Sequence, residues 1–235
     1  MNWNHQYASI NGIRVHYVDQ GQGMPVILCH GFPHLWFSWH RQITALAAAG
    51  YRVIAPDMRG MGQTDAPQDP RYYDIDHITG DLIGLLDHLQ LEQSVFAGLD
   101  FGAFAIYDLA LRHPERVMAV IGLENPAAPH NPQESPLTEY RRMGEQHFLH
   151  IEYFREPPRA DEELAAQPRR FLHKVFYTLS GSAAQRTILT VLNILLRLLI
   201  SMPWKSLRPC PGPGCPSKSW IILLKSTPAV ALQEV

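Results

Sequence analysis

Short apolar runs alternate with longer amphipathic stretches over the first 125 residues of the chain. Four of these runs have the length of buried strands, and they occupy residues 25–29, 51–55, 94–97 and 117–123. Two earlier runs, 6–10 and 13–19, flank Asn11-Gly12, a dipeptide typical of a two-residue hairpin turn. Strands that alternate with helical segments predict an α/β fold with a mostly parallel sheet and helices on both faces.

Three helices are expected between these runs, and the last of them ends at His113. The leucine-rich stretch 82–89 repeats its apolar residues at the spacing that places them on one helix face. An earlier helix is expected to have Ser38 as its N-cap and to end near Gly50. In the tail of the chain, residues 220–224 have the composition of one short strand.

Composition and charge narrow the class of protein mainly by exclusion. A formal net charge of -2 with both signs interspersed gives no basic surface for nucleic acid. The three cysteines, Cys29, Cys210 and Cys215, are too few for a disulfide framework or a four-ligand zinc site. Because the amino end also lacks the pattern of a secretory signal, we expect a cytoplasmic protein without a bound metal.

The candidate chemistry lies in residues 98–102, Gly-Leu-Asp-Phe-Gly, between the apolar run 94–97 and a helical stretch that ends at His113. A reactive side chain between two glycines at a strand-to-helix turn is typical of a nucleophile elbow. Aspartate is ionised at neutral pH and needs no base to attack an electrophilic carbon, whereas serine does. The elbow therefore predicts Asp100 as a nucleophile in alkyl rather than acyl chemistry.

At this point the chain resembles the α/β-hydrolase fold family, and within it the epoxide hydrolase branch, which also contains haloalkane and haloacetate dehalogenases. The matching stretches are His30 to Pro33, Tyr51 to Gly60, the elbow at Asp100, His113 to Val117, and Tyr153 to Pro157. The resemblance implies an α/β-hydrolase core at residues 1–125, a helical cap at 126–201 and a tail rich in proline and glycine at 202–235.

The resemblance also implies a two-step reaction and a set of site residues. Asp100 would open an epoxide through an alkyl-enzyme ester, which water then hydrolyses to a diol. The main-chain amides of Phe32 and Phe101 would form the oxyanion hole. Glu124 would orient a catalytic histidine, and His150 would donate a hydrogen bond to the epoxide oxygen. The implied substrate is a small apolar epoxide, with no cofactor and no membrane partner.

Other polar residues in the matching stretches are expected to be structural. The resemblance gives His30 a role in shaping its loop rather than in proton transfer, and it places Asp57 and Arg59 in a structural turn.

Dehalogenation is the nearest alternative, because a halide also leaves under attack by an aspartate. Haloalkane dehalogenases hold the halide with side-chain N–H donors, whereas Phe101 and Phe32 offer none. Haloacetate dehalogenases carry arginines after the nucleophile, where this chain has Phe101 and Phe104. The aromatic residues favour an uncharged, apolar substrate.

The carboxyl-terminal part departs from the family pattern. All 12 histidines lie at or before His173, although the family places its water-activating histidine after the last strand. Residues 187–202 form an apolar run that contains Arg197 and is shorter than the roughly 20 residues of a membrane span, which favours a cap or core helix. We interpret the end of the chain as truncated or frame-shifted, with core strands missing, so that a catalytically dead homologue is the second interpretation.

Overall fold

The computed structural model describes residues 2–125, 127, 133–146, 154, 159–179 and 220–223. Two compact units make up the chain. One consists of Met1–Ala127 with Leu195–Val235, and the other consists of Ala128–Ile194. The division into a core, a cap and a tail that the sequence suggests stays a prediction.

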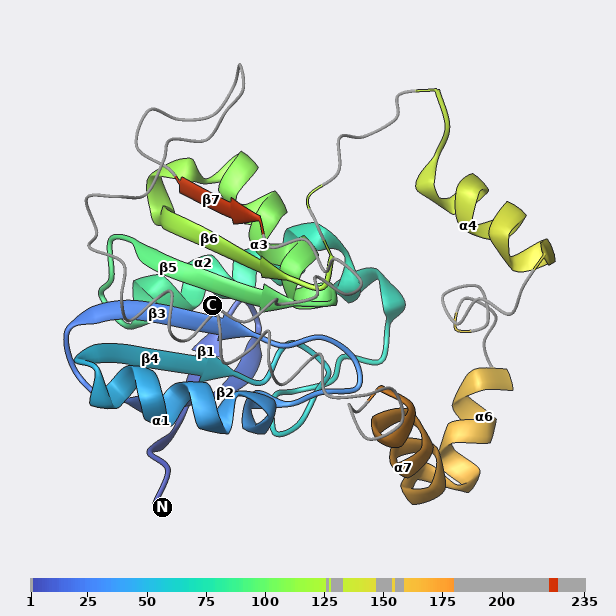
Figure 1. The fold of residues 1–235 in the computed structure, drawn as a ribbon, viewed down its shortest axis with the longest axis horizontal. Coiled ribbons are helices and arrows are strands. Elements are labelled where there is room, and N and C mark those ends of the chain that lie inside the picture. Colours follow the sequence, from blue (N-terminus) through green and yellow to red (C-terminus); the bar gives the residue numbers. More distant parts are fainter. Residues whose placement is uncertain are drawn as a thin grey trace, which may run out of the picture. The chain divides into compact units, whose positions relative to one another are not determined.

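The first unit is built on a seven-stranded sheet with the order β1-β2-β4-β3-β5-β6-β7 (Figure 1). The strands are β1 (His5–Ile10), β2 (Ile13–Gln20), β3 (Met24–Cys29), β4 (Tyr51–Pro56), β5 (Ser94–Leu99), β6 (Val117–Leu123) and β7 (Trp220–Leu223). β2 runs antiparallel to both β1 and β4, and the remaining neighbours are parallel. The mostly parallel sheet predicted from the alternating pattern is confirmed.

Helices lie on both faces of this sheet (Figure 1). They are α1 (His40–Ala48), α2 (Ile75–His88) and α3 (Phe101–Arg112). Ile27 of β3 packs in one cluster with Leu85 of α2 and Ile106 of α3. Its neighbours Val26 and Leu28 are equally buried and, because side chains alternate along a strand, face the opposite side. Burial of each such aliphatic side chain contributes about 1.5–3 kcal/mol.

The tight turn between β1 and β2 forms as the sequence predicts. Asn11 and Gly12 have φ angles of 49° and 78°, so both central residues are left-handed, which is the requirement of a type I′ hairpin. The Asn11 side chain also donates to Asp81 Oδ1 of α2 at 3.0 Å, which ties the hairpin to the helix. Local turn chemistry and a tertiary contact therefore support the same geometry.

The expected N-cap at Ser38 is wrong. Ser38 lies within a 3-10 helix, η1 (Trp36–Trp39), and α1 begins only at His40. The Ser38 hydroxyl turns back and donates to the Leu35 carbonyl at 2.9 Å. Because Trp36 and Trp39 are both buried, packing of their rings fixes this segment and overrides the capping preference of serine.

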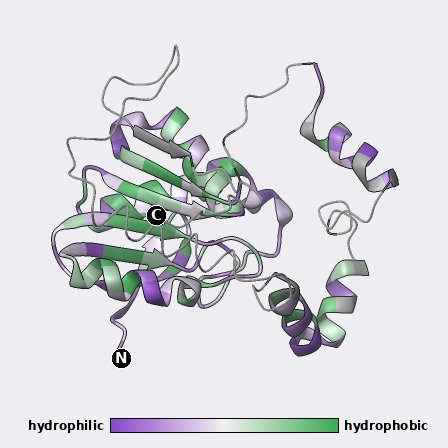
Figure 2. Cartoon of the chain, in the orientation of Figure 1, coloured by the Kyte–Doolittle hydropathy of each residue, from purple (hydrophilic) through white to green (hydrophobic). Residues whose placement is uncertain are grey.

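The strand expected in the tail is present as β7, one residue shorter than predicted, and it pairs with β6 in parallel. The described part of the second unit contains the helices α4 (Pro136–Gln146), α6 (Arg159–Ala166) and α7 (Pro168–Leu179). Hydrophobic residues are frequent along the strands of the first unit, whereas α4 is more hydrophilic (Figure 2).

None of the described helices combines the length and apolarity needed to cross a bilayer, and the run 187–202 lies outside the described residues.

Candidate active site

Four segments that carry candidate site residues begin where parallel strands end. They follow β3, β4, β5 and β6, and the carboxyl ends of parallel strands lie at one edge of the sheet. Ligands of open α/β sheets bind outside this edge. The fold therefore brings the loop after Cys29, the turn at Asp57, the elbow at Asp100 and the residue Glu124 to the same edge.

The elbow holds Asp100 in a strained backbone conformation with φ 54° and ψ -124°. A Cβ on Gly98 would lie 2.4 Å from the Gly102 carbonyl oxygen, and a Cβ on Gly102 would lie 2.3 Å from the Cys29 carbonyl oxygen. The two glycines therefore allow the first turn of α3 to pack directly on β5 and β3. This close packing makes the turn sharp enough to present the Asp100 carboxylate beyond the end of β5.

The loop after β3 lies against this carboxylate. The Phe32 amide donates to Asp100 Oδ1 at 2.9 Å, although the two residues are 68 positions apart. Gly31 approaches so closely that a Cβ there would lie 2.2 Å from the same oxygen. The loop is closed by the His34 amide, which donates to the Gly31 carbonyl at 2.9 Å. One backbone donor is thus already aimed at the proposed nucleophile.

Phe101 lies on the other side of Asp100, as the first residue of α3. The first amides of a helix have no intrahelical acceptor and lie at the positive end of its dipole, a position that suits an anion. The side chains of Phe101 and Phe104 are 58% and 44% exposed. The structure therefore places aromatic surface on the helix that begins at the nucleophile. The role of the Phe101 amide in an oxyanion hole stays a prediction.

His30 is held by backbone partners at both ring nitrogens. Its Nδ1 donates to the Gly31 carbonyl at 2.8 Å, and its Nε2 accepts from the Met58 amide at 3.0 Å. Burial lowers the pKa of His30, so the neutral ring that these two contacts require is the favoured form. With both nitrogens engaged, His30 joins the loops after β3 and β4 and has no nitrogen to offer a substrate.

Asp57 is an almost fully buried carboxylate with three donors. The Trp36 amide donates to Oδ1 at 3.0 Å, while the Gln63 amide and His16 Nδ1 reach Oδ2 at 3.0 and 2.8 Å. A Cβ on Gly62 would lie 2.2 Å from Oδ2. Asp57 therefore fastens three chain segments together, and this geometry gives it a structural role.

Arg59 makes a second buried structural contact. Its Nε and Nη2 donate to the two carboxylate oxygens of Asp81 at 2.8 and 2.6 Å. A bidentate pair of this kind fixes both side chains, and here it joins the turn after β4 to α2.

The remaining predicted site residues are Glu124 and His150. Glu124 directly follows β6 at the same edge as Asp100, is exposed and has φ 72°. Its role in orienting a histidine stays a prediction. His150 lies outside the described residues, so its role as a hydrogen-bond donor also stays a prediction.

His34 is a histidine near the nucleophile that the sequence analysis did not consider. It is half-buried, burial lowers its pKa, and the negative charge of Asp100 opposes that shift. Its only sequence signal is its place directly after the Gly-Phe-Pro segment. A residue type alone could not show that this segment folds onto the elbow.

Other groups that could carry chemistry are less suited to it. Cys29 is fully buried at the end of β3, and burial raises the pKa of its thiol, which makes it a poor nucleophile. Within the described residues, no group of three or more histidine, cysteine or acidic side chains could hold a metal ion. Cys210 and Cys215 lie outside those residues.

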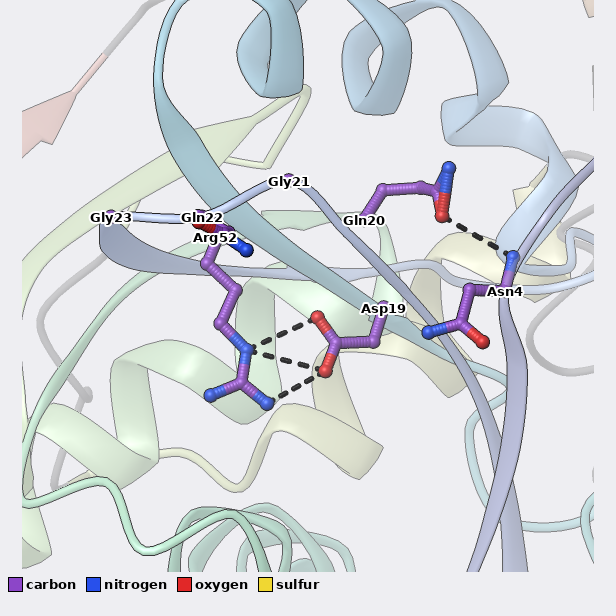
Figure 3. Close-up of a pocket in the computed structure, with 7 residues that line it drawn as sticks. All are labelled: Asn4, Asp19, Gln20, Gly21, Gln22, Gly23 and Arg52. Atoms are coloured by element: carbon purple, nitrogen blue, oxygen red, sulfur yellow. Dashed lines mark hydrogen bonds and ion pairs between the residues drawn. The ribbon is translucent and has the colours of Figure 1, made fainter.

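A polar pocket lies at the amino ends of β3 and β4. Figure 3 shows the residues that line it. Its lining residues are Asn4, Asp19, Gln20, Gly21, Gln22, Gly23 and Arg52. Arg52 is the second residue of β4. Its guanidinium Nη2 donates to Asp19 Oδ2 at 2.7 Å. Because this pocket is at the amino ends of the parallel strands and its cation is paired, it is separate from the site at Asp100.

Comparison with known proteins identifies the family. The model of the alpha/beta hydrolase fold family matches residues 24–166, which is more than half of the chain. The chain belongs to the alpha/beta hydrolase fold family. The α/β-hydrolase fold that the resemblance implied is thereby confirmed.

Among members of this family, the chain is similar to epoxide hydrolases. It is 44% identical over 167 residues to epoxide hydrolase A of Mycobacterium tuberculosis, a match that covers 70% of this chain and 52% of the relative. It is 40% identical over 176 residues to bifunctional epoxide hydrolase 2 of Rattus norvegicus, which covers 74% of this chain and 31% of the relative. The chain thus spans about half, or less, of the length of these relatives.

Solved structures give the same relationship. The crystal structure of epoxide hydrolase A from Mycobacterium thermoresistibile superposes with a TM-score of 0.72 at 41% identity, over 76% of this chain and 57% of that one. An epoxide hydrolase from Vigna radiata superposes with a TM-score of 0.65 at 39% identity, over 67% of this chain and 49% of that one. The resemblance to the epoxide hydrolase branch is confirmed for the part of the chain that aligns.

Proposed function

We propose that this chain converts a small apolar epoxide to a diol through an ester on Asp100. The observation that carries the proposal is the carboxylate presented by a strained elbow with its Oδ1 held by the Phe32 amide at 2.9 Å. Because Oδ1 is engaged, we assign the attack on the epoxide carbon to Oδ2. The similarity to proteins named epoxide hydrolases supports this chemistry.

The first step forms a carbon–oxygen bond to Asp100 and breaks one carbon–oxygen bond of the epoxide ring. The ring oxygen then carries negative charge and needs a donor, the role proposed for His150. In the second step, water attacks the carbonyl carbon of the ester and the bond to the substrate breaks. The products are the diol and the restored carboxylate.

Oδ1 has a part in both steps. It becomes the carbonyl oxygen of the ester, and negative charge returns to it when water attacks. A donor 2.7–3.1 Å from that oxygen stabilises such charge, and the Phe32 amide meets this distance at 2.9 Å. We propose the Phe101 amide, at the start of α3, as the second donor, and Glu124 as a carboxylate that orients a histidine at this edge.

Substrate class follows from the surface on α3. Phe101 and Phe104 offer exposed aromatic rings and neither a cation nor an N–H group in their side chains. They can bury the apolar substituent of an epoxide. They offer a departing halide no hydrogen bond and a substrate carboxylate no ion pair, which places dehalogenation second.

Product analysis with three substrates tests the proposal. Styrene oxide, fluoroacetate and a chloroalkane are each incubated with the purified chain and with the Asp100→Asn variant. We expect diol from styrene oxide with the unmodified chain, no diol with Asp100→Asn, and no halide from the other two compounds. Halide release without diol formation would place the chain with the dehalogenases instead.

A further inference from the structure

We propose that the Tyr107 hydroxyl positions the Glu124 carboxylate, because it holds the backbone turn on which Glu124 lies. This inference rests on the proposed function, in which Glu124 orients a histidine for hydrolysis of the ester. Tyr107 belongs to α3, the helix that begins directly after Asp100. One helix is thereby connected to both the nucleophile and the second acidic residue of the site.

The register of the sheet places Glu124 beside Asp100. Leu99 and Leu123 are the last paired residues of the parallel strands β5 and β6. Asp100 and Glu124 directly follow them, so the two acidic residues leave neighbouring strands at the same level of the sheet. Neighbouring strands are about 4.8 Å apart, which makes Glu124 a close backbone neighbour of the nucleophile.

Glu124 lies at the centre of a strained turn. The Asn125 amide donates to the Leu123 carbonyl at 2.8 Å, which closes a three-residue γ-turn around Glu124. Glu124 has φ 72°, which belongs to the rare and strained form of this turn. Among the described residues, Asp100 is the other acidic residue with a positive φ. A strained conformation persists only where surrounding contacts hold it, so the γ-turn needs a support.

The Tyr107 hydroxyl supplies this support from α3. It donates to the Asn125 carbonyl at 2.8 Å, and the Ala127 amide donates to its oxygen. The hydroxyl reaches this position across Gly122 of β6, where an added Cβ would lie 1.6 Å from it. One hydroxyl therefore bonds the chain one and three residues after Glu124, and it fixes the direction in which the chain leaves β6.

The hydroxyl and the ring of Tyr107 have separable roles. The half-buried ring packs against the main hydrophobic cluster of the first unit, a contact that phenylalanine would keep. Burial raises the pKa of the hydroxyl, so it stays protonated and remains a donor to the Asn125 carbonyl at neutral pH. Tyr107→Phe therefore removes the support of the γ-turn and leaves the packing of α3 in place.

Time-resolved mass spectrometry of the intact protein tests the proposal through a double-mutant cycle. The chain is mixed with styrene oxide and quenched with acid, and the rates at which the ester on Asp100 appears and disappears are measured. Tyr107→Phe, Glu124→Gln and the double variant are compared with the unmodified chain. The matched control is Tyr7→Phe, which removes a tyrosine hydroxyl that donates to Gln63 Oε1 at 2.5 Å from the edge strand β1.

We expect the ester to form at a similar rate in all five proteins, because none of the changes alters Asp100 or the Phe32 amide. Decay should be about 10-fold slower in Tyr107→Phe, the size of one hydrogen bond, and at least about 100-fold slower in Glu124→Gln. The double variant should decay at the rate of Glu124→Gln, because Tyr107 acts through Glu124. Tyr7→Phe should match the unmodified chain.

Unchanged decay in Tyr107→Phe or in Glu124→Gln would overturn the proposal. A double variant that decays about 10-fold more slowly than Glu124→Gln would also overturn it, because Tyr107 would then act independently of Glu124. Slower formation of the ester together with slower decay in Tyr107→Phe would show a purely structural role. The absence of an ester in every protein, or an ester that never decays in the unmodified chain, would instead contradict the proposed function and the inference with it.

Discussion

Two aspartates at the same edge of one sheet, Asp57 and Asp100, have opposite environments. Asp57 follows β4 and Asp100 follows β5, the two strands that flank β3. The Asp57 carboxylate is almost fully buried and accepts from two amides and a histidine. The Asp100 carboxylate is half-buried on a strained backbone and accepts from the Phe32 amide. The oxygens of Asp57 are engaged by donors that hold the loops together. At Asp100 the Phe32 amide engages Oδ1, and the proposed function assigns the attack to Oδ2.

A single loop connects the two aspartates. Near its start, the Phe32 amide bonds to Asp100, and near its end the Trp36 amide bonds to Asp57. Asp57 therefore acts on the site indirectly, by fixing the loop that carries the donor to Asp100. Fold position alone does not separate a structural carboxylate from a reactive one, but the set of donors around each does.

The largest expected effect comes from Asp100→Asn. The amide has nearly the same shape as the carboxylate but is not a nucleophile, so diol formation should fall on the order of 10⁴-fold or more. The unfolding midpoint in urea should stay close to that of the unmodified chain, because Asp100 is half-buried and is not a centre of packing. Undiminished diol formation would show that another residue attacks the epoxide.

Asp57→Ala, in contrast, should have its main effect on the free energy of unfolding. It removes the acceptor of the Trp36 and Gln63 amides and of His16, and such loss of a buried charged partner costs about 3–5 kcal/mol of unfolding free energy. Urea denaturation followed by circular dichroism measures this cost. A loss below about 1 kcal/mol would contradict the structural role of Asp57.

Gly31→Ala tests the contact between the loop and Asp100 separately from the contact with Asp57, because it disturbs the loop only at the Asp100 end. The new Cβ would lie 2.2 Å from Asp100 Oδ1, so the carboxylate or the loop must move. Displacement of a reacting group by about 1 Å can cost about 100-fold in rate, and we expect a loss of this size in adduct formation. Gly12→Ala is the control, since it strains a turn whose Cβ would meet nothing within 4 Å. Equal adduct rates in the two variants would argue against the close approach.

The smallest expected effect is on the pH dependence of stability. Burial holds the pKa of both His30 and His34 below the ordinary value of 6.5, so below that pH the unfolded chain binds protons that the folded chain does not. The contribution of these two histidines to the free energy of unfolding should therefore be level from about pH 7.5 to about pH 8.5 and should decrease as the pH falls through 6.5. Urea midpoints across this range measure the trend, which should be weaker in His34→Gln. A midpoint that rises on acidification would contradict the neutral state of these rings.

The sequence predicted what depends on local pattern. The hairpin at Asn11-Gly12 follows from turn chemistry, and the strands follow from apolar runs of the right length. The elbow followed from glycines whose need for close backbone packing is visible in the structure at Gly98 and Gly102. These features are encoded within a few neighbouring residues.

The sequence did not predict contacts that depend on distant segments. The approach of Phe32 to Asp100 joins residues 68 positions apart, and only the family resemblance suggested it. The start of α1 was misplaced at Ser38 because burial of two tryptophan rings, rather than a cap, determines it. The position of His34 near the elbow also escapes sequence reasoning, since it comes from the turn that its amide closes on the Gly31 carbonyl.

Peptide mapping of the covalent adduct tests the central claim most directly. The chain is mixed with styrene oxide, quenched with acid within the lifetime of the ester, digested and analysed by tandem mass spectrometry. Added mass on Asp100, and its absence in Asp100→Asn, is the predicted result. Added mass on a different residue, or diol formed with Asp100 never modified, would contradict the assignment of the nucleophile.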